Sequence, residues 1–181
     1  MHKTILRIAA FTALLILAAS GCTSAPSPQV QSGPTAKPQV LAGGCATTVV
    51  TEAEPPAWAL GGFTQPTGTP WTLPWAQGTG GDAVAFLFAR QLVAGASPRV
   101  DGTNNKVLWV VKGNPSNLVV EGVPPGATQA TFTVNGGPSI VDVPTAGCWT
   151  FQLKWSQAGT AGSTFHLDVL PAGTMPPPPA A

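Results

Sequence analysis

The sequence feature that most constrains the fold is an alternation of large apolar and polar side chains near the end of the chain. From Trp149 onward the apolar side chains occupy every second position, at Trp149, Phe151, Leu153 and Trp155, with Thr, Gln and Lys between them. This period of two is typical of a β-strand that has one face in a hydrophobic core. Pro144 precedes the stretch and indicates that the chain enters the strand through a turn.

Similar short segments recur along the chain and are separated by turn residues. The sequence contains 21 Gly and 20 Pro, a content that suits an all-β domain with many turns. Segment 82–95 is ambiguous, because Asp82 and Gly95 could begin and end a helix, whereas its apolar residues alternate as in a strand. We interpret its first half as a strand. The predicted strands are 47–52, 84–89, 106–112, 118–121, 129–134, 140–143, 149–155 and 163–170.

These strands predict a β-sandwich of about seven to nine strands within residues 45–170. Segment 106–112 is apolar on both faces, which favours a central strand, and segment 47–52 is expected at an edge. Between these two strands, residues 53–81 form a long irregular region rich in Pro and Gly. The Pro-rich tail 171–181 is expected to be disordered or extended.

The N-terminus has the pattern of a secretory signal. Basic residues at the start of the chain, including Lys3 and Arg7, are followed by the apolar run 8–19, which is too short to span a bilayer. Residues 19–22, Ala-Ser-Gly-Cys, resemble a bacterial lipobox. The resemblance implies cleavage after residue 21, acylation of Cys22, and a lipid-anchored protein on the extracytoplasmic face of a bacterial cell membrane. The alternative is an ordinary secreted protein. Residues 22–44 are then expected to be a flexible Pro/Ser-rich tether with no fold.

The two remaining cysteines, Cys45 and Cys148, predict a disulfide. In an exported protein a cysteine pair more often forms a disulfide than a metal site. Cys148 has the opposite parity to Trp149 in the predicted strand, so its side chain points away from the apolar face. We therefore expect this bond to attach the N-terminal segment to the outside or the edge of a sheet.

Segment 143–153, Val-Pro-Thr-Ala-Gly-Cys-Trp-Thr-Phe-Gln-Leu, resembles the penultimate strand of immunoglobulin-like domains, in which an aromatic residue closes the corner before the strand. Together with Cys45 and its Pro-rich loop, segments 83–88 and 106–111, and the final amphipathic strand, it is similar to an uncharacterised family of bacterial lipoproteins and secreted proteins. The resemblance covers about residues 45–170. It implies an immunoglobulin-like sandwich and an envelope location, and it transfers no catalytic residue.

The sequence offers few groups for catalysis or metal binding. After removal of the signal, His166 is the last remaining His, and Asp168 lies two residues on, on the same face of its strand. A Ser-His-Asp hydrolase site is conceivable, but the strained Gly-x-Ser-x-Gly turn is absent, so a polar row on a surface strand is favoured. Glu52 and Glu54 could flank a sugar, but we expect them to be solvated surface residues. We predict no catalytic residue, no metal site and no cofactor.

Charge argues against nucleic acid as a partner. Without Lys3 and Arg7, six basic side chains face seven acidic ones, and no basic stripe is present to neutralise phosphates. The predicted partners are the bilayer, through acylated Cys22, and a protein or glycan of the cell envelope.

Three tryptophans of the irregular region, Trp58, Trp71 and Trp75, form a candidate ligand platform. They could stack on a sugar or a hydrophobic partner, or they could cap an open end of the sandwich, which we favour because of their large apolar area. The predicted function is a non-catalytic display or interaction module. The alternative is glycan or cell-wall binding through the Trp-rich loop, and a hydrolase is the third hypothesis.

Overall fold

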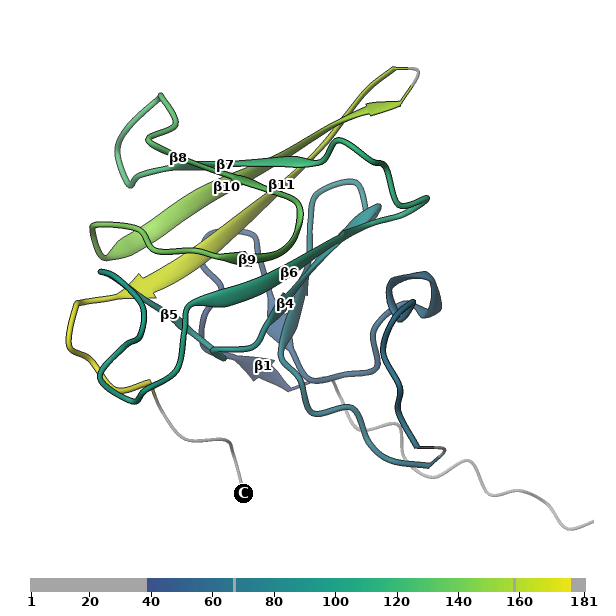
Figure 1. The fold of residues 1–181 in the computed structure, drawn as a ribbon, viewed down its shortest axis with the longest axis horizontal. Helices are drawn as coiled ribbons and strands as arrows, with labels where there is room; N and C mark the ends of the chain where they lie inside the picture. Colours follow the sequence, from purple (N-terminus) through teal and green to yellow (C-terminus); the bar gives the residue numbers. More distant parts are fainter. Residues whose placement is uncertain (1–38, 67, 158, 177–181) are drawn as a thin grey trace, which may run out of the picture. The chain divides into compact units, whose positions relative to one another are not determined.

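A computed structural model describes residues 39–66, 68–157 and 159–176 of this 181-residue chain. The described part is all-β and contains two sheets, drawn as two layers in Figure 1, with one short 3-10 turn, η1 (Ala57–Ala59), and no α-helix. The predicted signal peptide, Cys22 and most of the tether lie outside the described residues. None of the described helical segments has the length and hydropathy of a transmembrane span.

The first sheet has six strands in the order β1-β2-β3-β4-β6-β9, and all of its pairs are antiparallel. Its strands are β1 (Val40–Leu41), β2 (Val50–Thr51), β3 (Trp75–Gln77), β4 (Ala83–Leu87), β6 (Lys106–Val111) and β9 (Gly137–Ile140). The segment predicted to be a central strand, β6, is an inner strand that pairs with β4 on one side and with β9 on the other.

The second sheet has five strands in the order β5-β11-β10-β7-β8. Its strands are β5 (Leu92–Val93), β7 (Val119–Val123), β8 (Phe132–Asn135), β10 (Gly147–Gln157) and β11 (Gly159–Leu170). β5 runs parallel to β11 and the other pairs are antiparallel. The long β10–β11 hairpin extends beyond β7, as Figure 1 shows.

The core lies between the two sheets, as the alternating pattern predicted. Trp149, Phe151 and Leu153 of β10 are almost completely buried. Trp109 of β6 meets Phe151 at 5.6 Å between ring centroids, and it meets Phe165 of β11 at the same distance, so these rings join the sheets. The described strands thus form a β-sandwich, as expected.

Several strand boundaries differ from the prediction. The prediction that residues 47–52 form an edge strand is wrong, because β1 pairs along the outer side of β2. β1 also lies within the predicted tether, so regular structure begins before Cys45. β3 and β5 were not predicted, because strands of two or three residues are too short to show a period. After β11, Thr174 N–H donates to Pro171 O in a turn.

The outer edge of β11 is closed by three segments from elsewhere in the chain. β5 pairs with its last two residues. Cys45 N–H donates to His166 O at 3.0 Å, and Thr79 N–H, from the β3–β4 turn, donates to Thr164 O at 3.1 Å. The two sheets are thereby joined by hydrogen bonds along this side. At the opposite side the chain passes from β8 to β9 through the single residue Gly136.

A polar network holds the loop between β5 and β6. The Arg99 guanidinium is buried, donates to the carbonyls of Gln91 and Ala89, and forms an ion pair with Asp101. Asp101 also accepts hydrogen bonds from the backbone N–H and the hydroxyl of Thr103. The bonds from Arg99 first, and then from Thr103, hold the pKa of Asp101 well below its usual range.

Candidate functional site

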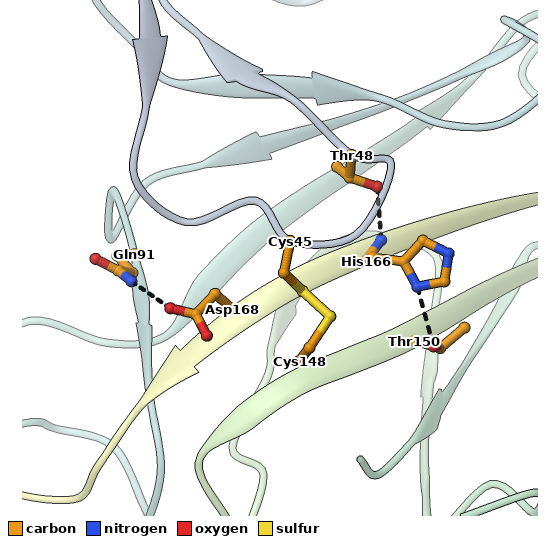
Figure 2. Close-up of a disulfide and its surroundings, with 7 residues drawn as sticks. All are labelled: Cys45, Thr48, Gln91, Cys148, Thr150, His166 and Asp168. Atoms are coloured by element: carbon orange, nitrogen blue, oxygen red, sulfur yellow. Dashed lines mark hydrogen bonds between the residues drawn. A yellow bond between two sulfur atoms is a disulfide. The ribbon is translucent and has the colours of Figure 1, made fainter. Parts of the chain in front are cut away.

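The disulfide joins Cys45 to Cys148 across 103 residues, with 5.9 Å between the two Cα atoms. Figure 2 shows it lying across β11, between the N-terminal segment and β10. Cys148 is half-buried and faces away from the core, whereas its neighbour Trp149 is completely buried. The predicted pair and its position outside the sheet are thus both found.

His166 and Asp168 lie beside this bond but do not pair with each other. His166 Nδ1 is 3.1 Å from the Thr150 hydroxyl on β10. The Asp168 carboxylate instead accepts a hydrogen bond from the Gln91 amide at 3.0 Å, as Figure 2 shows. In a Ser-His-Asp site the carboxylate orients the imidazole, so in the described part of the chain this pair lacks that arrangement. Across the described ranges, no group of three His, Cys, Asp or Glu side chains has metal-binding geometry.

The Trp-rich loop covers the outer face of the six-stranded sheet. Val84 and Phe86 of β4 point away from the main core and pack with Trp75 in a second hydrophobic cluster, against which Trp58 and Trp71 also pack. The loop therefore covers a sheet face rather than an open end of the sandwich, contrary to the favoured prediction. The sequence of residues 106–112 is apolar on both faces of the strand because this loop covers the face that points away from the main core.

The three tryptophans do not form one flat platform. Trp75 is 7% exposed, and its indole N–H donates to Ala53 O at 2.6 Å. Trp58 is half-buried in η1. Trp71 is also half-buried, but it lines the surface hollows of this loop, which neither of the other two does among the hollows described.

The largest of these hollows has a volume of about 410 Å³. Its aromatic wall is made by Phe63 and Trp71, and its polar groups come from Glu54, Gln65 and Thr69. A smaller hollow of about 320 Å³ shares Trp71 and all three polar residues. Sequence reasoning identified Trp71 and Glu54 separately. It missed Phe63 and Gln65, because no periodic pattern marks residues that meet within an irregular loop.

A larger cleft, of about 720 Å³, lies at the side of the sandwich opposite the disulfide. It is lined by β6, by residues 114–119 and by residues 135–138, and none of its lining side chains is charged. Trp109 belongs to this lining, but its indole nitrogen is buried and has no hydrogen-bond partner among the described residues. The cleft therefore offers uncharged polar groups and no aromatic ring that is open to solvent.

Comparison with known proteins gives no match: no family model fits this chain, and no curated protein or solved structure is significantly similar to it.

Proposed function

We propose that this protein is a membrane-anchored extracytoplasmic lipoprotein that acts as a non-catalytic display or interaction module. The N-terminal sequence supports acylation of Cys22, which would place the chain on the outer side of a bacterial membrane. The observation that carries the proposal is the disulfide at the entry to the domain. Cys45, which follows β1 near the start of the described domain, is held to β11 by a backbone hydrogen bond and to β10 by the disulfide. Such a junction suits a domain suspended from a lipid anchor.

We further propose that the sandwich is of the immunoglobulin-like type, as in the resembling family of lipoproteins. That fold pairs strands A, B, E and D in one sheet and strands C, F and G in the other, and the described strands offer counterparts for the sets A-B-E and C-F-G. The orders β4-β6-β9 and β7-β10-β11 correspond to these two sets, and β8 extends the second sheet as strand C′ does. β1, β2 and β3 are then additions beside strand A.

The corner before β10 supports the same assignment. In immunoglobulin domains a Tyr near the start of strand F binds a backbone group a few residues upstream. Here Trp149 occupies this place, and its indole N–H donates to Thr145 O at 2.8 Å. Phe151, two residues on, contacts Trp109 of β6, where antibody domains have the B–F disulfide.

The anchoring can be tested by metabolic labelling with a palmitate analogue in a bacterial host. The wild-type chain should take up the label and sediment with membranes, and Cys22→Ala should lose the label. Cys45→Ala/Cys148→Ala is the matched control, because these thiols lie outside the lipobox and its label should persist. Absence of label on the wild-type chain, or label retained by Cys22→Ala, would disprove acylation of Cys22.

A second candidate function is glycan or cell-wall binding through the Trp-rich loop. The observation that favours it is that half-buried Trp71 lines a surface hollow next to a carboxylate and an amide. Titration of the intrinsic tryptophan fluorescence with cell-wall glycans tests this function, and an unchanged emission spectrum would count against it.

A further inference from the structure

The hollow beside Trp71 combines one fixed aromatic ring with a set of hydrogen-bond acceptors. The indole N–H of Trp71 donates to Leu73 O, so this group is occupied within the protein. The ring also contacts Phe63 edge-on, at 5.2 Å between centroids, and it leans against Phe86 at 5.5 Å. Because the ring is already fixed on these sides, a ligand would meet a preformed apolar surface at a small entropic cost.

The polar groups of the hollow are mainly acceptors. Glu54 contributes a carboxylate, which only accepts hydrogen bonds. The Gln65 amide nitrogen donates one N–H to Thr69 O at 2.8 Å, so its carbonyl oxygen remains to accept a hydrogen bond and its second N–H remains to donate one. The Thr69 hydroxyl, which can donate or accept, lies in the same lining. A ligand that satisfies this set must itself carry several donors.

The charge of the hollow limits further which classes of ligand could bind there. No Lys, Arg or His lines any of the three hollows around Trp71, and Glu54 is the one charged residue in their linings. A carboxylate or phosphate on the ligand would be repelled by Glu54 and would find no cation there. The volume of about 410 Å³ lies within the usual range for small-molecule sites.

We infer that this hollow is a binding site for a neutral sugar residue. A pyranose presents an apolar C–H face, which suits Trp71, and a ring of hydroxyl donors, which suits Glu54 and Gln65. This inference deepens the interaction role proposed above and rests on it. It replaces the predicted three-tryptophan platform with a site in which Trp71 alone supplies the indole ring.

The test is isothermal titration calorimetry of the full chain in detergent. The probes are cellotetraose, maltotetraose and chitotetraose, which are neutral, and tetragalacturonate, which is anionic. We expect at least one neutral probe to bind at concentrations up to about 10 mM and the anionic probe to bind more weakly. Failure of all three neutral probes, or tighter binding of tetragalacturonate, would overturn the inference.

Variants locate the site. Trp71→Ala should weaken binding at least about tenfold, as expected for an aromatic side chain at the centre of a binding site. Trp58→Ala, which changes a half-buried Trp of the same loop that lines none of these hollows, should retain binding. Trp71 also packs against the second cluster, so Trp71→Ala could weaken binding by destabilising the loop. Glu54→Gln and Gln65→Ala avoid this problem because both side chains are exposed, and each should weaken binding several-fold. Unchanged affinity in both would overturn the site. Palmitate labelling of the same protein reports the anchor separately, so a failed sugar site and a failed anchor are distinguishable.

Discussion

The indole N–H of Trp149 donates to the carbonyl of Thr145 at 2.8 Å and closes the corner that leads into β10. Trp109, on the facing sheet, is as deeply buried, but its indole N–H has no hydrogen-bond partner among the described residues. These two core tryptophans therefore differ in that the indole N–H of Trp149 has a hydrogen-bond partner and that of Trp109 has none among the described residues.

This difference predicts unequal costs for the same substitution. Trp149→Phe and Trp109→Phe remove similar volumes from the core, but only Trp149→Phe also removes a hydrogen bond. We expect Trp149→Phe to lower the free energy of unfolding by about 1 kcal/mol more than Trp109→Phe does. Urea denaturation of both variants measures the difference, and equal losses would show that the corner hydrogen bond contributes nothing.

Removal of the disulfide should destabilise the domain strongly. The bond closes a loop with a sequence separation of 103 residues, and such a constraint on the unfolded chain stabilises a protein by about 2–5 kcal/mol. Cys45→Ala/Cys148→Ala should therefore unfold at a clearly lower urea concentration than the wild type. Cys22→Ala is the control, since this position lies outside the predicted domain. Coinciding curves for the double variant and the wild type would contradict the prediction.

Gly44 should not tolerate a side chain. A Cβ at this position would lie 2.3 Å from the carbonyl oxygen of Thr48, a backbone atom in the same tight segment. We expect Gly44→Ala to cost about 1–3 kcal/mol of stability, as overpacking does. At Gly61 a Cβ would meet no atom within 4 Å, so Gly61→Ala should stay within about 0.5 kcal/mol of the wild type. Thermal unfolding of both variants and the wild type measures these changes, and equal stability of Gly44→Ala and Gly61→Ala would contradict the prediction.

Asp101 should make the stability depend on pH in the acidic range. Its folded-state pKa is depressed, first by Arg99 and then by Thr103, so the unfolded chain takes up the proton at a higher pH than the folded chain does. The stabilisation is present above the unfolded pKa of about 4 and is lost as the pH falls below it. In Asp101→Asn the free energy of unfolding should decrease less between pH 5 and pH 2 than in the wild type.

The control for this pH effect is Asp82→Asn. Asp82 is exposed, and within the described ranges its carboxylate forms no hydrogen bond or ion pair. Over the same pH range, the free energy of unfolding of Asp82→Asn should change with pH as steeply as that of the wild type does. If the free energy of unfolding of Asp101→Asn changes with pH as steeply as that of the wild type, the ion pair between Asp101 and Arg99 does not contribute to the pH dependence of stability.

Residues 149–155 determined a great deal by themselves. Their alternation of apolar and polar side chains fixes which face of the strand is buried, because successive residues of a strand point to opposite faces. The same parity placed Cys148 outside the sheet, and the count of cysteines paired it with Cys45. Local periodicity is enough to fix the buried face and the direction of Cys148, since both depend only on neighbouring residues, whereas the pairing with Cys45 followed from the number of cysteines.

Only the tertiary structure decided where the irregular loop goes. The sequence shows that β6 is apolar on both faces. It does not show that residues 53–74 bury the outer face, because their irregular sequence has no period that would assign them to a sheet face. For the same reason the sequence could not show that the three tryptophans of this region have different environments. Trp75 is buried, Trp58 is half-buried in η1, and Trp71 lines the hollow. The two-residue strand β5 exists because the much longer β11 offers it hydrogen bonds, and the two-residue β1 pairs with β2, which pairs in turn with β3. Long-range contacts of this kind depend on the whole fold, and no short stretch of sequence records them.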